Sequence, residues 1–367
     1  MRKLASIQKI VDVIPIKDAD KIELVKVMGW QCVAKKDEFK KDDLCVYFEI
    51  DSFLPINDKF EFLRASSYRN NELLGEGFKL RTVKMRGELS QGLCLPIDTF
   101  KEDFEKNNIV ITEDSIGLDV SDVLGVRKWE ILEMASSGGT IIGDLPYGIP
   151  HTDETRIQNV PELINAIDEE NKKGNDYYIS TKMDGSSHSI MINEDNEIFV
   201  TGHNFVYADD GKSDFYEYVK KNQIIEKIQD IKVLLNAKAV TIQGEFCGPG
   251  IQKNRMKLKA PCWYVFVISK DYDIRLGLNE MLSICEQFDL YTVPIEEVGS
   301  DFATKYPTSD DLLVRANGDY HDDNGKSVGK KEGIVVRTVT PVRTDLCDSG
   351  WLSLKAVSNN YLLKNDD

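Results

Sequence analysis

Long apolar runs are missing from this chain of 367 residues. No hydrophobic stretch approaches the roughly 18 residues of a membrane-spanning helix, so we expect no membrane span. The N-terminus has early cations but no apolar segment behind them, so we expect no secretory signal either.

Paired cysteine motifs and histidine clusters are also missing. The seven cysteines are an odd number, lie far apart and include no Cys-x-x-Cys pair, which argues against a disulfide framework and against a cysteine zinc site. The four histidines do not occur at metal-ligand spacing. We therefore expect free thiols in a protein of the reducing cytoplasm.

Positive charge is scarce, and the formal net charge is −16. A field of that sign repels nucleic acid, so polynucleotide binding would need local basic stripes. Two such stripes are present, "FKLRTVKMRG" and "QKNRMKLK", and in the second the cations alternate as on one face of a strand. The candidate RNA-contacting residues are Lys79, Arg81, Lys84, Arg86, Lys253 and Arg255.

The first part of the chain is β-rich. Residues 1–130 contain about five short runs of branched and aromatic residues separated by Asp-, Asn- and Gly-containing turns, a pattern that favours an OB-like β-barrel. Residues 131–150 are rich in Gly and Ser and are bounded by Pro, as in a linker between domains.

Residues 151–367 mix strands with a few helices in a non-alternating order, which indicates an α+β domain. Apolar residues at helical spacing predict helices in "PELINAIDEENKK", "SDFYEYVKKNQIIEKIQDIKVLLN" and "LNEMLSICEQFDL". Strands are predicted in "DYYISTKM", "SHSIMIN", "EIFVTG", "AVTIQGEF", "WYVFVIS", "GIVVRTV" and "WLSLKAV".

Several of these strand ends carry a charged residue beside a glycine. They are "TKMDGSS", "IQGEFCG" and "KEGIVVRT", and the strand "WLSLKAVS" adds a lysine. If the fold joins them in one cleft, two lysines meet three carboxylates. Carboxylates suit Mg²⁺ or Mn²⁺, and a lysine with a lowered pKa is a nucleophile, so the set suggests nucleotidyl transfer through a lysine phosphoramidate.

The order of these motifs resembles the covalent nucleotidyltransferase superfamily of polynucleotide ligases and RNA capping enzymes. "KMDGSS", "IQGEFCG", "WYVFVIS", "EGIVVR" and "LSLKAVS" are similar to its motifs I, III, IIIa, IV and V. The N-terminal stretches "DADKIELVKVMGWQCVAKKDEFKKDDLCVYFEIDSFLP" and "FKLRTVKMRGELSQGLCLPI", with "TDETRIQN", resemble the Naegleria-type RNA ligases over about residues 5 to 360.

The resemblance implies an OB domain followed by an ATP-grasp-like, antiparallel-sheet nucleotidyltransferase domain. It also implies an ATP-dependent enzyme that joins RNA 5′-phosphate and 3′-OH ends. Lys182 would take AMP from ATP, while Asp184, Glu245 and Glu332 would hold Mg²⁺ or Mn²⁺, mainly through waters. The implied ATP-binding residues are Arg156, Gln158, Lys182, Gly185, His203, Phe266, Glu332 and Lys355.

Two positions depart from the family pattern. His203 stands where an arginine is expected, and Ser353 replaces the first of two motif V lysines, so that Lys355 keeps the charge alone. Neighbouring Arg337 is a possible replacement, whereas Lys330 and Lys331 are interpreted as surface charges.

Two other functions remain open from the sequence. The first is a DNA ligase or GTP-using capping enzyme, although capping enzymes usually carry their OB domain after the lysine motif. The second is a non-catalytic RNA-binding OB protein, against which the intact set of lysines and carboxylates argues. We expect the enzyme to act as a monomer.

Overall fold

The computed structural model describes residues 2–129, 139–322 and 324–365. The chain divides into two compact units. Unit 1 comprises Met1–Leu132, Gln158–Pro161 and Leu362–Asp367, and unit 2 comprises Glu133–Ile157 and Glu162–Tyr361. The sequence-based boundaries at 130 and 150 stay a prediction, since 130–138 lie outside the described residues.

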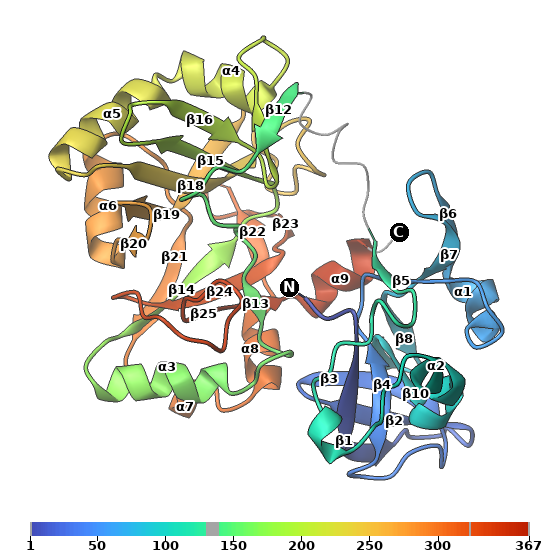
Figure 1. Cartoon of the computed structure of the whole chain (residues 1–367). Helices are drawn as coiled ribbons and strands as arrows, with labels where there is room; N and C mark the ends of the chain where they lie inside the picture. Colours follow the sequence, from blue (N-terminus) through green and yellow to red (C-terminus); the bar gives the residue numbers. More distant parts are fainter. Residues whose placement is uncertain (1, 130–138, 323, 366–367) are drawn as a thin grey trace. The chain divides into compact units, whose positions relative to one another are not determined.

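Unit 1 is built on a curled five-stranded sheet, drawn in blue in Figure 1. Its order is β10-β4-β1-β2-β3, with bounds Leu93–Pro96, Leu44–Phe48, Ala5–Pro15, Ile22–Val27 and Trp30–Lys35. The first half of β1 pairs with β4 and the second half with β2, with a register shift between Ile10 and Asp12. Such an irregularity bends a strand, which lets one sheet curl into a partial barrel.

The rest of unit 1 covers this sheet. A second sheet has the order β11-β5-β7-β6, with bounds Arg127–Lys128, Ser52–Leu54, Gly75–Lys79 and Tyr68–Asn71. The hairpin β8–β9 (Thr82–Met85 and Glu88–Gln91) lies beside β3, where Val33 N–H donates to Ser90 Oγ at 2.9 Å. The helices are η1 (Glu61–Leu63), α1 (Arg64–Ser67), η2 (Ile97–Phe100), α2 (Lys101–Lys106) and η3 (Glu113–Ser115).

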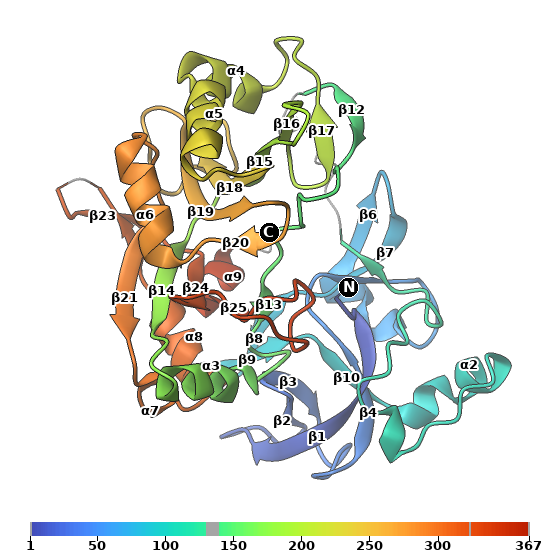
Figure 2. The same ribbon diagram turned by 60° about the vertical axis from the view of Figure 1, so that its left-hand side comes forward.

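Unit 2 contains two larger, mostly antiparallel sheets (Figure 2). The seven-stranded sheet has the order β12-β17-β16-β15-β18-β19-β20, with bounds Ile141–Asp144, Phe205–Tyr207, Ile198–Thr201, Ser186–Ile192, Val240–Cys247, Cys262–Lys270 and Ile274–Arg275. The five-stranded sheet has the order β13-β25-β24-β14-β21, with bounds Thr155–Arg156, Ser353–Val357, Gly333–Thr338, Tyr177–Lys182 and Ile295–Gly299. A separate hairpin joins β22 (Asp319–His321) to β23 (Ser327–Lys330).

Helices cover one face of each large sheet. Helices α4 (Asp214–Lys221), α5 (Ile224–Leu234) and α6 (Leu278–Gln287) bury apolar side chains against the seven-stranded sheet. Helices α3 (Leu163–Lys172) and α8 (Ser309–Ala316) pack on the five-stranded sheet, with α7 (Phe302–Lys305) beside α3, and α9 is Asn359–Asn365. No helix among the described residues is long and apolar enough to cross a membrane.

Two local predictions are corrected. The helix predicted over "SDFYEYVKKNQIIEKIQDIKVLLN" is two helices, α4 and α5, because Gln223 has a φ of 54° and interrupts the backbone spiral. The stripe "QKNRMKLK" is a loop rather than a strand. Positive φ angles at Asn254 and Lys257, and hydrogen bonds between the Asn254 side chain and the Leu258 backbone, fold it into turns.

Candidate active site

Alternation along β18 separates a core face from a polar face. Val240, Ile242 and Phe246 belong to the hydrophobic core under the helices. Because successive strand residues point to opposite faces, Glu245 projects to the other side of the sheet, opposite its neighbour Phe246. Its register partner on β15 is Ser187, which faces the same way. The polar face of this sheet lines the candidate site.

The five-stranded sheet brings Lys182 and Glu332 together. Lys182 is the last residue of β14 and pairs with Gly333, the first residue of β24. Glu332 immediately precedes that glycine, and its Oε1 lies 2.8 Å from Lys182 Nζ. Gly333 is required here, because a Cβ at this position would lie 2.2 Å from the Ala356 carbonyl oxygen of β25.

The charges around Lys182 set its protonation state. Burial alone would lower the pKa of Lys182, but the negative charges of Glu332, Glu245 and Asp184 outweigh it and hold the pKa above the usual value. A lowered pKa, which a lysine nucleophile needs, is therefore not produced by the side chains around Lys182 alone. Burial, assisted by the nearby carboxylates and opposed by Lys182, raises the pKa of Glu245 to about 7.

Asp184 lies in the turn after β14 and has partners on both carboxylate oxygens. Arg255 forms an ion pair with Oδ2, and the Tyr361 hydroxyl donates to Oδ1 at 2.8 Å. Arg255 was predicted as an RNA contact, and nothing in the sequence linked it to the carboxylate. The following Gly185 leaves no room for a side chain, since a Cβ would lie 2.4 Å from the Phe246 carbonyl oxygen.

A cavity of about 160 Å³ lies within unit 2 and is lined from both sheets. Five of the predicted site residues line it, namely Lys182, His203, Glu245, Phe266 and Lys355. Its lining combines charged side chains with an aromatic ring, which suits a polar small molecule such as a nucleotide. Sequence reasoning missed the lining residues Thr152, Asp153, Glu154 and Ser187, although the first three precede Arg156 in the quoted "TDETRIQN" stretch.

The missed residues contact the predicted ones. Asp153 lies between two nitrogen-bearing side chains, with one carboxylate oxygen 3.4 Å from His203 Nε2 and the other 3.8 Å from Lys355 Nζ. Thr152 Oγ1 is 2.7 Å from Ser187 Oγ and 3.4 Å from His203 Nδ1. His203 is thus held by side chains from the 151–154 segment.

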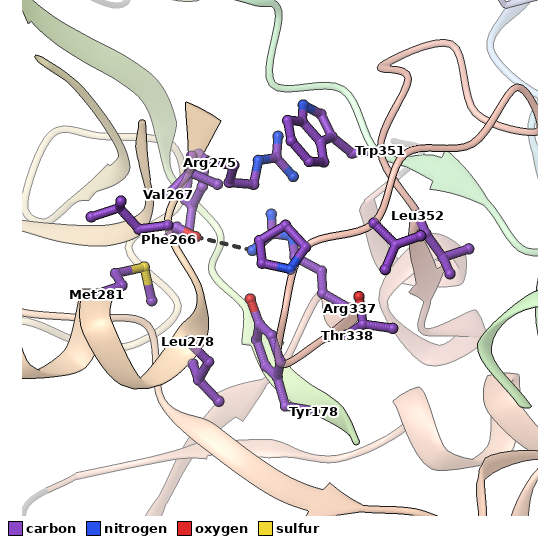
Figure 3. A pocket seen from close by; sticks show the side chains of 13 residues that line it. Tyr178, Phe266, Val267, Arg275, Leu278, Met281, Arg337, Thr338, Trp351 and Leu352 are labelled. Carbon is purple, nitrogen blue, oxygen red and sulfur yellow. Dashed lines mark hydrogen bonds between the residues drawn. The ribbon is translucent and has the colours of Figure 1, made fainter. Parts of the chain in front are cut away.

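Arg337 is buried and makes several polar contacts, one of them with the backbone of Phe266. Its guanidinium donates to the Phe266 carbonyl oxygen at 3.1 Å and to Ser353 Oγ at 3.2 Å, and it forms an ion pair with Glu154. Figure 3 shows a second, much smaller pocket, where Arg337 lies near Arg275, Trp351 and Tyr178. Arg337 is therefore a core residue at the site.

The two lysines before Glu332 differ from each other. Lys330 is exposed and pairs with Asp319 at 2.6 Å, as expected of a surface charge. Lys331 is only 5% exposed, and its Nζ lies 2.7 Å from Glu296 Oε1, so its interpretation as a surface charge was wrong. Its carboxylate partner made burial possible.

The remaining predicted residues lie away from the lining of this cavity. Arg156 on β13 pairs in parallel register with Lys355 on β25. Gln158 is fully buried and belongs to unit 1. Its backbone carbonyl oxygen accepts a hydrogen bond from the Gly29 N–H at 2.8 Å. Lys79, Arg81, Lys84 and Arg86 also belong to unit 1, and Lys84 and Arg86 are exposed around the β8–β9 hairpin turn. Lys253 is exposed in the loop that carries Arg255.

Family models match both parts of the chain. An OB-fold domain model matches residues 4–97, and an RNA ligase model matches residues 175–357. No match was found among curated protein sequences.

Solved structures of Naegleria gruberi RNA ligase are similar to the whole chain. The structure with PPi is 35% identical, with a TM-score of 0.83 and 100% of both chains covered. The structure of a mutant with AMP and Mn has the same identity, TM-score and coverage. The structure of a mutant with ATP and Mn is 34% identical, with a TM-score of 0.82 and 100% of both chains covered. The predicted α+β fold, an OB domain followed by a mostly antiparallel domain, is confirmed. The chain belongs to the RNA ligase family and is an RNA ligase of the Naegleria type.

Proposed function

We propose that this RNA ligase uses ATP to form a covalent AMP adduct on Lys182 and then seals RNA ends. The observation that supports this most directly is the 2.8 Å pair of Lys182 Nζ and Glu332 Oε1, with Lys182 in the lining of the cavity. An aromatic ring, Phe266, and a second lysine, Lys355, line the same cavity.

The first step is attack of Lys182 Nζ on the α-phosphorus of ATP. The new N–P bond forms as the bond to the pyrophosphate leaving group breaks. Because the pKa of Lys182 is raised, the amine must lose a proton first, and Glu332 is placed to accept it. Lys355 contributes a positive charge for the α-phosphate, and Phe266 offers an aromatic face to adenine.

Two further transfers complete the reaction. An oxygen of the RNA 5′-phosphate attacks the lysyl-AMP phosphorus, which releases Lys182 and gives an RNA adenylate. A 3′-OH then attacks the 5′-phosphate and expels AMP. Both ends must therefore reach the same cavity, and the basic residues Lys84, Arg86 and Lys253 are proposed to contact the RNA backbone.

The carboxylates at the site suit a hydrated divalent cation. No group of three or more acidic, cysteine or histidine side chains in the described residues could hold a metal ion directly. However, Asp184, Glu245 and Glu332 concentrate negative charge around Lys182, and this charge helps to raise the pKa of Glu245. We propose that these three residues hold Mg²⁺ or Mn²⁺ through waters. The cation would neutralise phosphate charge.

The other predicted ligands extend this proposal. Arg156 lies beside Lys355 in the β13–β25 register, which suits a contact near the nucleotide. Gly185 and His203 are proposed to complete the ATP site, and a role of Gln158 in ATP binding stays a sequence-based prediction. A monomer in the cytoplasm remains our proposal, and the seven free cysteines support a reducing compartment.

Labelling with ATP that carries ³²P at the α-phosphate tests the proposal. Purified protein is incubated with Mg²⁺ or Mn²⁺ and run on a denaturing gel, beside Lys182→Ala and a parallel reaction with labelled GTP. We expect label on the wild type only and from ATP only. Label on Lys182→Ala would overturn the assignment of the nucleophile, and label from GTP would favour a capping-type reaction. Intact mass shows whether the protein already carries AMP.

A further inference from the structure

Tyr320 is a buried tyrosine next to the proposed nucleophile. It lies in β22 and is 6% exposed. Its side chain packs in a small apolar cluster with Met183, Cys247, Met256 and Val293. Met183 directly follows Lys182, so the ring of Tyr320 lies against the turn that ends β14.

The hydroxyl of Tyr320 joins the two strands that carry the reactive pair. It donates to the Lys182 carbonyl oxygen at 2.7 Å and accepts from the Glu332 N–H at 3.1 Å. The β14–β24 ladder ends at the pair Lys182–Gly333, so this hydroxyl continues the connection one step beyond the last pair. A tyrosine hydroxyl carries its proton at neutral pH and can donate one hydrogen bond while it accepts another.

The side chains of the same two residues are joined as well, since Lys182 Nζ lies 2.8 Å from Glu332 Oε1. The carbonyl oxygen of Glu332 accepts from Ser358 N–H at 2.8 Å, so the remaining backbone group of Glu332 is also fixed. A hydroxyl that donates to one strand and accepts from the other restrains both backbones. Displacements near 1 Å at a reacting group can lower rates by about 100-fold, so such a restraint matters.

We propose that Tyr320 is a positioning residue for lysine adenylylation: its hydroxyl fixes the backbone of Lys182 to that of Glu332, so that Nζ is held for attack. The proposal rests on the proposed role of Lys182. Tyr320 does not touch ATP in this account, and it acts only through the two residues that it joins.

The test is Tyr320→Phe, which removes the hydroxyl and keeps the ring. Single-turnover formation of lysyl-AMP is measured across ATP concentrations. We expect the maximal rate to fall by about 10- to 100-fold, while the ATP concentration at half-maximal rate changes less than about 3-fold. Sealing of pre-adenylylated RNA, which needs no attack by Lys182, should fall much less.

Tyr306→Phe is the matched control. Tyr306 is 5% exposed, and its hydroxyl donates to Glu297 Oε2 at 2.9 Å, away from the cavity lining. The Tyr306→Phe variant also loses one buried hydroxyl contact, yet its rate of lysyl-AMP formation should stay near that of the wild type. Rates are compared at a temperature at which circular dichroism shows all the proteins folded.

Each outcome bears on a separate claim. A wild-type adenylylation rate in Tyr320→Phe overturns the positioning role, even if Lys182→Ala is inactive. Equal slowing of adenylylation and of pre-adenylylated RNA sealing also overturns it, because that result indicates a general structural effect. Label on Lys182→Ala overturns the nucleophile assignment itself, whatever Tyr320→Phe does.

Discussion

The guanidinium of Arg255 forms an ion pair with the carboxylate of Asp184, two residues after the proposed nucleophile. The same guanidinium lies over the ring of Tyr361, with 4.8 Å from its carbon to the ring centroid. Tyr361 in turn donates to the other oxygen of Asp184. Asp184 is 4% exposed, so the loop after β18 contributes directly to the charge balance of the site.

Arg255→Gln should therefore slow lysyl-AMP formation as well as sealing. Loss of the guanidinium leaves the buried Asp184 carboxylate without this positive charge, so we expect the side chain to shift although Tyr361 still donates to it. Rates of adenylylation and of sealing pre-adenylylated RNA are measured separately, with a decrease of about 10-fold or more expected in the first. Lys253→Gln, an exposed cation in the same loop, should change only RNA-dependent steps. Normal adenylylation by Arg255→Gln would restrict Arg255 to RNA binding.

Glu154→Gln should destabilise unit 2. Burial alone would raise the pKa of Glu154, but Arg337 and Arg275 outweigh it and hold the pKa below its usual value. Removal of this charge leaves two buried guanidinium groups without their shared carboxylate, at a cost of about 3–5 kcal/mol in unfolding free energy. Urea unfolding of the wild type and the variant measures this loss of unfolding free energy. Glu169→Gln, which breaks an exposed pair with Lys172, should cost at most about 1 kcal/mol, and equal losses would contradict the argument.

Acid should destabilise the protein partly through His188. This side chain is 1% exposed, stacks on Phe215 at 4.1 Å between ring centroids, and has its pKa lowered by burial from 6.5 to about 4. The unfolded state binds the proton more tightly, so the stability is present above pH 6.5 and is lost as the pH falls towards 4. The full loss is about 3 kcal/mol.

His188→Asn should flatten that pH dependence while lowering stability at neutral pH. Unfolding free energies between pH 7 and 4 provide the comparison, with His321→Asn, an exposed histidine, as the control. A slope in His188→Asn as steep as in the wild type would mean that other groups cause the acid sensitivity.

Gly185→Ala should impair both stability and adenylylation. The new Cβ would meet Cys247 Sγ at 2.6 Å and Glu245 Cγ at 2.9 Å, in addition to the Phe246 carbonyl. Overpacking of this kind costs about 1–3 kcal/mol and would displace Glu245 from the cavity. Gly143→Ala has no heavy atom within 4 Å and should leave thermal stability and labelling unchanged. Unimpaired activity of Gly185→Ala would show that this turn adapts.

Charge reversal of Lys84 and Arg86 should weaken sealing without unfolding unit 1. Both side chains are exposed, so Lys84→Glu/Arg86→Glu removes cations from the surface and not from the core. Sealing at low RNA concentration should fall at least about 10-fold, with a weaker salt dependence, while the melting temperature stays constant. Unchanged ligation would exclude this hairpin from RNA contact.

Strand chemistry was predictable because it is local. The alternation in "AVTIQGEF" gives both the core face of β18 and the position of Glu245. The predicted strand "DYYISTKM" corresponds to β14, which ends at Lys182, one residue earlier than predicted. Charged residues beside glycines marked the site, since close backbone approach at Gly185 and Gly333 leaves no room for a side chain.

Contacts between distant segments were not predictable. Arg255 and Asp184 are 71 residues apart, and Tyr320 is 138 residues from the carbonyl that it binds. A tyrosine hydroxyl bonded to backbone groups leaves no periodic signal in a sequence. The basic loop was misread for another reason: alternating cations mimic a strand, whereas the turn is determined by backbone angles at Asn254 and Lys257.

The antiparallel ladder between β14 and β24 also limits how this enzyme can tolerate insertions. Since side chains alternate along a strand, a single added residue in either strand would turn Lys182 to the opposite face of the sheet from Val335 and Arg337. A two-residue insertion would restore the face but shift the lysine by about 7 Å along the strand. Length variation should therefore accumulate in turns such as the one between β15 and β16, outside the paired segments that carry the reactive groups.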